Sequence, residues 1–152
     1  MPRTRKDNPV SQTAPVNIYS HAKDIVAALT AAEEIIHTSG FDYKLHYLLR
    51  LRASQMNGCA FCVKMHTAEA RKVGETNERL DRLIVWRHVS DFTAREKAAF
   101  AYVEALTECG GRTDYGAQRA NLRSHFSDAE IATMTTIVAM INMWNRIQVS
   151  QH

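Results

Sequence analysis

Signals that start and stop helices recur along most of this 152-residue chain, and they constrain its fold more than any other feature. Thr93 precedes Glu96, and Ser127 precedes Glu130, at the spacing of a capping box. Thr76 can cap a further helix, and glycines follow several of the helical patterns. No alternating strand pattern of useful length occurs. The sequence therefore predicts an all-α fold of six or seven helices.

The expected organisation is a short N-terminal arm followed by one helical domain. Residues 1–17 contain all three prolines and are expected to form an arm or loop, and residues 18–152 to form a single all-helical domain. The last expected helix is apolar around most of its circumference, which is typical of a helix in the centre of a core or in an oligomer contact. The expected helices span approximately residues 20–40, 43–57, 59–73, 78–89, 94–108 and 128–150.

Composition and charge argue against several classes of protein. A net charge of +3 is too small to indicate nucleic-acid binding, and no apolar run approaches the length of a membrane-spanning helix. No apolar segment follows the charged N-terminal residues as it would in a secretory signal. We therefore expect a cytoplasmic protein that binds neither nucleic acid nor membrane. Because cytosolic thiols are kept reduced, a close cysteine pair in such a protein is expected to be catalytic or metal-binding.

The segment SQMNGCAFCVKMH, residues 54–66, contains the residues most able to carry chemistry. Each helical residue advances by about 100 degrees, so Cys59, Cys62 and His66 lie along one face of a helix that begins near Cys59. The free N–H groups and the dipole at that helix start favour an anion such as a thiolate. A cysteine in this position and beside a histidine typically has a lowered pKa.

This layout predicts a division of roles. His66 stands one turn after Cys62 and can accept its proton, so Cys62 is the expected thiolate that attacks a peroxide oxygen and becomes a sulfenic acid. Cys59, one turn earlier, is placed to convert that sulfenic acid into a disulfide. Two alternatives remain open on these grounds. One is a zinc site with a fourth ligand such as Cys109, and the other is a pair of buried, unreactive cysteines.

The wider sequence resembles a known family. The segments LLRLRASQMNGCAFCVKMHTAEARKVGE, RLIVWRHVSDFTAREKAAFAYVEALT and INMWNRI are similar to the alkylhydroperoxidase-D-like (AhpD-like) branch of the carboxymuconolactone decarboxylase superfamily, over roughly residues 40–147. The resemblance implies an all-helical fold, assembly into homotrimers or homohexamers, and thiol-dependent reduction of hydroperoxides. It also implies regeneration by a dithiol reductant, either a lipoylated or a thioredoxin-like protein. That cycle needs no metal, haem or flavin cofactor.

Carried over by position, the resemblance assigns the sulfenic acid to Cys62, its disulfide partner to Cys59 and the relay histidine to His66. The chain departs from the family at one point. Members with the peroxidase relay usually have a glutamate twelve residues before the first cysteine, where this chain has Tyr47. A tyrosine, with an ordinary pKa of about 10, cannot be the carboxylate end of a relay, and His46 turns to another side of its helix. Slow reduction of simple peroxides, or disulfide exchange with a partner, is therefore an expected outcome.

Two other functions fit the family or the motif. One is a decarboxylase-type lyase that acts on a lactone acid, and the other is a non-enzymatic redox-sensing or zinc-stabilised oligomer. Outside the motif, Trp86 and Trp144 are expected to pack in the core or an interface, and Ser54 to hold the turn before the cysteines. Asn145 and Arg146 are expected to fix helix ends or subunit contacts.

Overall fold

The computed structural model describes residues 13–152, and these residues are folded into helices without any strand. This confirms the predicted all-α class. Eight α-helices and one 3₁₀ helix are present in the described part, which is more than the six or seven expected. They are α1 (Ile18–His21), α2 (Lys23–His37), α3 (Tyr43–Met56), α4 (Ala60–Lys72), α5 (Asn77–Arg82), the 3₁₀ helix η1 (Leu83–His88), α6 (Ala94–Glu108), α7 (Tyr115–Arg123) and α8 (Asp128–Val149).

The larger number of helices has local causes. Ser20 is not the helix start expected from its residue type, because Asn17 caps α1 and the chain breaks at Ala22 before α2. The expected helix over 78–89 divides into α5 and η1 after Arg82, and Val85 leaves helical geometry inside η1, at φ −115° and ψ 24°. Helix α7 was not expected at all, because its sequence YGAQRANLR has few apolar positions. Expectations for residues 1–12 lie outside the described residues.

The predicted start signals act as helix caps. The Thr93 side chain accepts a hydrogen bond from the backbone N–H of Glu96, whose carboxylate accepts the N–H of Thr93, and Ser127 and Glu130 make the same reciprocal pair. The Thr76 side chain caps α5 by accepting the N–H of Arg79. Each of these bonds satisfies a backbone donor that the helix itself leaves free. Residues within one turn of each other therefore determine where these helices begin.

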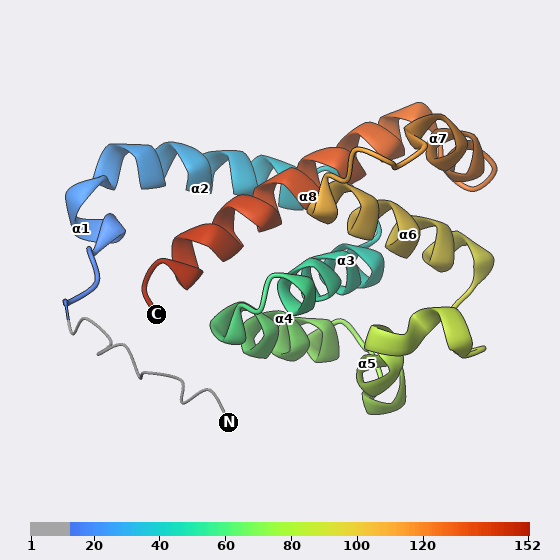
Figure 1. Ribbon diagram of the computed structural model, residues 1–152, viewed down its shortest axis with the longest axis horizontal. Coiled ribbons are helices and arrows are strands. Elements are labelled where there is room, and N and C mark those ends of the chain that lie inside the picture. The colour runs from blue at the N-terminus through green and yellow to red at the C-terminus, as the bar shows by residue number, and fades with distance from the viewer. Residues whose placement is uncertain (1–12) are drawn as a thin grey trace, which may run out of the picture.

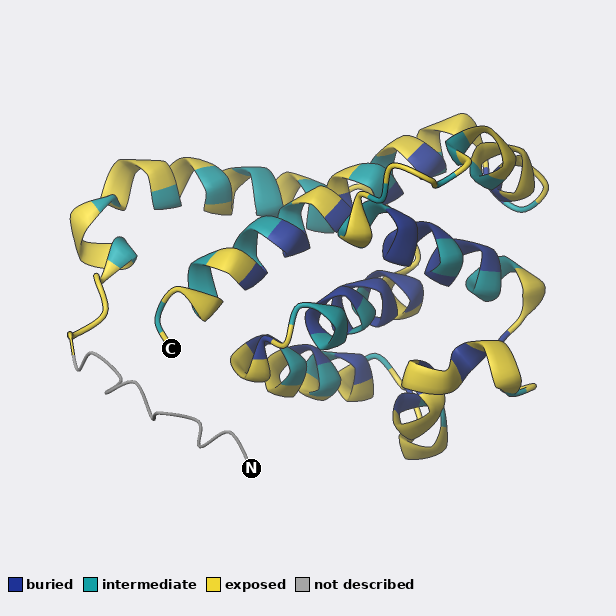
Figure 2. Ribbon diagram, in the orientation of Figure 1, coloured by how far each residue is buried: buried dark blue, intermediate teal, exposed yellow. Residues whose placement is uncertain are grey.

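Helix α3 is the centre of the fold. It packs against α4, α6 and α8 (Figure 1), and most of its residues are buried. Figure 2 shows the buried residues concentrated on α3 and on the faces of α4, α6 and α8 that are turned toward it. The long α8 lies against α3, α6 and α2, so it is a core helix along much of its length, as its apolar sequence indicates. Leucines and other apolar side chains of these helices form one continuous core.

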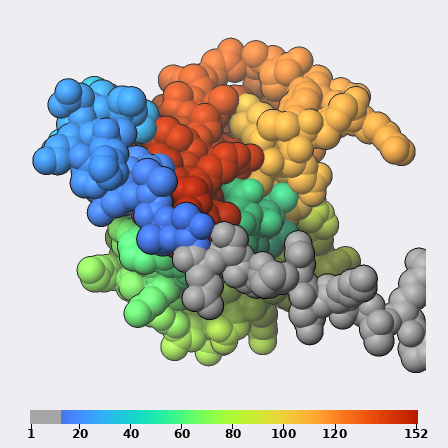
Figure 3. Space-filling view, turned by 60° about the vertical axis from the view of Figure 1, so that its left-hand side comes forward, coloured from blue at the N-terminus to red at the C-terminus, as the bar shows by residue number. Residues whose placement is uncertain are grey.

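Helices α1 and α2 are organised differently. Neither contains a buried residue, and α2 packs within the chain on α8. Figure 3 shows α1 and α2 at the surface beside the C-terminal part of α8. Within the described residues, no helix is both long and apolar enough to cross a membrane.

Candidate functional site

The turn between α3 and α4 places the two cysteines. Helix α3 ends at Met56 with Asn57 as its C-cap, and Gly58 follows with φ +65°, a left-handed conformation that glycine adopts without steric cost. The backbone N–H of Cys59 then donates to the carbonyl of Ser54 at 3.1 Å. Cys59 becomes the N-cap residue of α4, and its sulfur accepts the N–H of Cys62 at 3.3 Å.

Cys59 and Cys62 form a disulfide, with their Cα atoms 5.3 Å apart. Both residues are almost fully buried, at 0% and 1% exposure. Both sulfurs lie within the first turn of α4, where the unpaired N–H groups and the helix dipole stabilise a negative charge. The expected position of the pair at a helix start is therefore what the structure contains.

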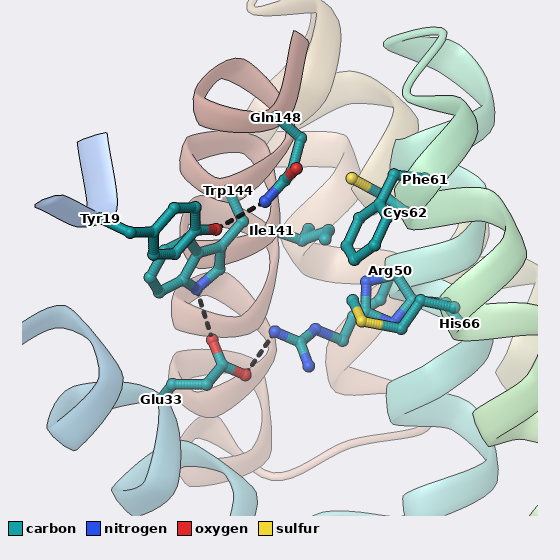
Figure 4. Close-up of a pocket in the computed structure, with 10 residues that line it drawn as sticks. Tyr19, Glu33, Arg50, Phe61, Cys62, His66, Ile141, Trp144 and Gln148 are labelled. Atoms are coloured by element: carbon teal, nitrogen blue, oxygen red, sulfur yellow. Dashed lines mark hydrogen bonds and ion pairs between the residues drawn. The ribbon is translucent and has the colours of Figure 1, made fainter. Parts of the chain in front are cut away.

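A pocket of about 330 Å³ gives access to one of the two cysteines. Cys62 and His66 line it, whereas Cys59 does not. Figure 4 shows the pocket between α4, α8 and the α3 side chain of Arg50. The wall is mostly apolar and aromatic. The residues around it are Tyr19, Glu33, Arg50, Phe61, Cys62, Met65, His66, Ile141, Trp144 and Gln148.

His66 is 1% exposed, and its two ring nitrogens have different surroundings. Nδ1 lies 2.7 Å from Oε2 of Glu69, one turn later on α4. Nε2 is buried and has no hydrogen-bond partner within the described chain. Burial lowers the pKa of His66 below its ordinary value, and the charge of Arg50 lowers it further, against the opposing hydrogen bond and charge of Glu69. His66 is therefore neutral at pH 7.

Glu69 determines which tautomer His66 adopts. Burial alone raises the pKa of Glu69, but the hydrogen bond with His66 and nearby positive charges bring it below its ordinary value. The carboxylate is thus ionised at neutral pH and can only accept, so Nδ1 of His66 carries the proton and donates it. Nε2 then keeps a free lone pair, which is the form a general base requires.

Tyr47, the residue at the position of the usual family glutamate, does not line the pocket. Its side chain is half-buried, and its ring packs near His37 and His46. Burial raises the pKa of Tyr47, and the neighbouring charge of Glu69 raises it further, so the phenol stays protonated. His46 is buried on the same helix, with Nε2 unpartnered among the described residues.

An ion pair also lines the pocket. The Arg50 guanidinium, through Nη2, pairs with Oε1 of Glu33 from α2. The other oxygen of Glu33 accepts the indole N–H of Trp144 from α8 at 3.0 Å. Figure 4 shows this chain of contacts running across the pocket from α2 to α3. Trp144 packs against the core, as expected, and it also faces the pocket, which the sequence did not indicate.

Amide side chains tie the cysteine turn to α8. Asn57 donates to the side-chain oxygens of Asn142 and Asn145, at 3.0 and 2.9 Å. Asn145 in turn donates to the hydroxyl of Ser54 at 2.9 Å, and that hydroxyl donates to the carbonyl of Arg50. Ser54 thus helps hold the turn, and Asn145 fixes a helix end, as the sequence predicted.

The structure brings together the three residues chosen from sequence, and it adds three that sequence reasoning missed. Glu69 could have been predicted from the sequence, since it follows His66 by three residues on one helix face. No sequence pattern places Arg50 or Glu33 at the pocket, because they reach it only through the packing of α3 and α2 against α8. Cys109 is exposed at the end of α6 and does not line this pocket, and the described residues contain no group of three or more His, Cys, Asp or Glu able to hold a metal.

Comparisons with known proteins agree with this geometry. The model of the carboxymuconolactone decarboxylase family matches residues 23–105. The uncharacterised protein YdfG of Bacillus subtilis (strain 168) is 32% identical over 135 residues, which are 89% of this chain and 92% of YdfG. The crystal structure of ATU0492 from Agrobacterium tumefaciens, of unknown function with a suggested AhpD-type antioxidant defence role, superposes with a TM-score of 0.85. It is 35% identical and covers 91% of this chain and 95% of its own.

A second solved structure extends the similarity in fold. It is the alkylhydroperoxidase AhpD core of an uncharacterised peroxidase-related protein from Ralstonia eutropha JMP134, with a TM-score of 0.71 and 21% identity. The match covers 85% of this chain and 69% of that one. The chain described here therefore belongs to the carboxymuconolactone decarboxylase family and is an AhpD-like member of that superfamily.

Proposed function

We propose that the protein is a thiol-dependent oxidoreductase that reduces organic hydroperoxides through the Cys59–Cys62 pair. One observation carries the proposal: Cys62 and His66 line the same pocket, and Nε2 of His66 has no hydrogen-bond partner among residues 13–152. A base with a free lone pair beside a cysteine at a helix start is the arrangement that produces a reactive thiolate.

The cycle begins with the reduced pair. His66 accepts the proton of Cys62 at Nε2, and the thiolate attacks one oxygen of the hydroperoxide. The O–O bond breaks, Cys62 becomes a sulfenic acid, and the alkoxide takes the proton from His66 and leaves as an alcohol. The Cys59 thiol then attacks the Cys62 sulfur, which releases water and forms the disulfide. An external dithiol reduces the disulfide and is itself oxidised to a disulfide.

Exposure to the pocket decides which of the two cysteines reacts first with the peroxide. Cys62 lines the pocket and Cys59 does not, so a bulky peroxide meets Cys62 first. Cys59 lies one turn back, within disulfide distance. We propose that Cys62 is the peroxide-reacting residue, Cys59 the resolving residue, and His66 the base.

The proposed setting is a cytoplasmic homo-oligomer, a trimer or a hexamer, that is regenerated by a lipoylated or thioredoxin-like protein. An uncovered apolar surface supports self-association. Ile25 and Ile35 of α2 are 64% and 72% exposed, and an apolar groove runs between α2 and α8 beside Ile35. A surface of this kind is typical of a contact between protein chains.

The proposal is tested by following thiol loss and intact mass after one equivalent of cumene hydroperoxide is added to reduced protein. Wild type should lose two hydrogens as the disulfide forms. Cys59→Ser should react at a similar rate but stop at a sulfenic acid on Cys62, which dimedone traps. Cys62→Ser should react about a thousandfold more slowly, because it lacks the activated thiolate.

The control is Cys109→Ser, which removes an exposed thiol outside the pocket. It should leave both the rate and the two-hydrogen loss unchanged. Oxidation of wild type no faster than that of an ordinary free cysteine would contradict the peroxidase proposal, and disulfide exchange with a partner would then be the reaction to examine.

A further inference from the structure

Arg50 is a buried cation that the proposed cycle does not use. It is 8% exposed in an otherwise mostly apolar wall, and a buried charge is costly unless it is well paired. Its pairing is incomplete. Glu33 engages one terminal nitrogen, Nη2, while Nε is buried without a hydrogen-bond partner in the described part of the chain. A guanidinium presents its donors as a planar fork suited to a carboxylate, and this fork is only partly occupied.

Two donors from different helices converge on one carboxylate in this pocket. Arg50 of α3 and the indole N–H of Trp144 of α8 both bind the side chain of Glu33. These two donors belong to the packed core helices. Glu33 comes from α2, which has no buried residue, and its side chain is 20% exposed. The donors are thus fixed by the fold, whereas the acceptor comes from a surface helix and is partly open to solvent.

We propose that Arg50 and the Trp144 indole form a carboxylate-binding subsite, which the Glu33 carboxylate occupies in the free protein. A substrate carboxylate takes the place of Glu33 on these donors, and Glu33 turns toward solvent. This proposal rests on the proposed function for its chemistry: it makes the preferred substrates organic hydroperoxides that carry a carboxylate group. Binding of the carboxylate itself does not depend on any reaction at Cys62.

The rest of the pocket fits such a molecule. Phe61, Ile141 and the Trp144 ring provide apolar surface in the same pocket as Arg50, Cys62 and His66 (Figure 4). An apolar body held there would have its acidic end at Arg50 and its peroxide end near Cys62 and His66. Apolar walls with a few convergent polar groups are typical of small-molecule sites.

The first test measures binding without any redox step. Calorimetry with 4-isopropylbenzoate, a carboxylate that cannot oxidise a thiol, should show binding to the wild-type protein, and 4-isopropylbenzamide should bind at least about tenfold more weakly. Arg50→Gln should lose the preference for the acid. Glu33→Gln should bind the acid more tightly than wild type, because the competing carboxylate is gone. Arg112→Gln, which removes an exposed positive charge elsewhere, should bind as wild type does.

Arg50→Gln leaves Glu33 without its cation, so a double variant guards against misfolding. Glu33→Gln combined with Arg50→Gln keeps an amide at each position, and it too should lose the preference for the acid. Equal binding of acid and amide by wild type, or an acid preference that survives in the double variant, would overturn the subsite.

The second test connects the subsite to chemistry. Reduced protein is mixed with 4-carboxycumene hydroperoxide or with its methyl ester, and thiol loss is followed for each. The acid should react about tenfold faster than the ester in wild type and at an equal rate in the double variant. Fast but equal reaction of both would reject the subsite and leave the peroxidase function intact. Slow reaction of both, with acid-selective binding by calorimetry, would reject the peroxidase function and leave the subsite.

Discussion

Helices α3 and α4 hold the cysteine site in the most buried part of the molecule, whereas α1 and α2 reach the same pocket without burying a residue (Figure 2). The contrast does not come from a lack of apolar side chains in α2, which contains Ile25, Ile35 and Ile36. It comes from what the rest of the chain places beside each helix. α3 is surrounded by α4, α6 and α8, while α2 has α8 on one side.

The difference in burial between α4 and α2 corresponds to two different requirements of the site, a fixed reacting centre and a way in for a ligand. The groups that must hold a fixed geometry, Cys62 and His66, are both buried on α4, which packs against the central helix α3. Glu33 reaches the pocket from α2 and is held there by Arg50 and Trp144. A rigid reacting centre with a more easily moved neighbour is suited to admitting and releasing a ligand. The following changes test this contrast.

The largest effect on folding is expected in α3. Leu48 is fully buried, so Leu48→Ala should lower the free energy of unfolding by about 2–5 kcal/mol through lost apolar contact and the cavity it leaves. Urea denaturation followed by circular dichroism measures this. A loss below about 1 kcal/mol would show that the centre of the fold is less tightly packed than α3 indicates.

A second effect concerns His46, also on α3. Burial, followed by the charges of Arg50, His37 and His66, lowers the pKa of His46 to about 3. Its unfolded pKa is about 6.5, so between these values the unfolded state binds the extra proton, and stability falls as the pH drops below 6.5. His46 should therefore account for about 2 kcal/mol of lost stability between pH 7 and pH 5.

The variant His46→Phe keeps a planar ring that does not titrate. Its stability should therefore fall by about 2 kcal/mol less than that of wild type between pH 7 and pH 5. Denaturation curves at pH 7 and pH 5, for wild type and variant, give the comparison. An equal loss of stability between pH 7 and pH 5 in the two proteins would contradict the buried, neutral state of His46.

A third effect concerns the histidine within the site. Glu69→Gln should slow the reaction of Cys62 with hydroperoxide about tenfold, because the tautomer of His66 is no longer fixed. Since Glu69 raises the pKa of His66 against burial, its removal should also move the acid limb of the pH–rate profile to lower pH. The exposed Glu78→Gln on α5 is the matched control and should change neither quantity. A rate loss without a shifted acid limb would indicate only a structural role for Glu69.

The smallest effect on folding is expected in α2. Ile35→Asp should leave the helical circular dichroism unchanged and alter the unfolding of the single chain by less than about 0.5 kcal/mol, since the side chain is exposed. It should nevertheless lower the mass of the assembly in light scattering, because it places a charge in the proposed contact surface. An unchanged mass would mean that the chains associate through another surface or not at all.

The features of the fold that could be predicted from the sequence were those that depend on residues close together in the chain. The capping boxes at Thr93 and Ser127 predicted two helix starts, and Gly58 marked the turn before the cysteines. Helix α7 escaped prediction because it has few apolar positions, although Asp114 caps its start and its Ala, Gln and Arg residues favour a helix. It packs against α6 and α8. The change from α5 to η1 after Arg82, and the kink at Val85 inside η1, have no local sequence signal that we can identify.

For the site, the sequence by itself determined that Cys59, Cys62 and His66 share one helix face at a helix start, because the period and caps of a helix act over only a few residues. Tertiary structure alone decided that Cys62, and not Cys59, faces the pocket, and that Arg50, Glu33 and Trp144 meet across it from three helices. Those contacts join residues up to 111 positions apart, and only the packing of α2, α3 and α8 brings them together.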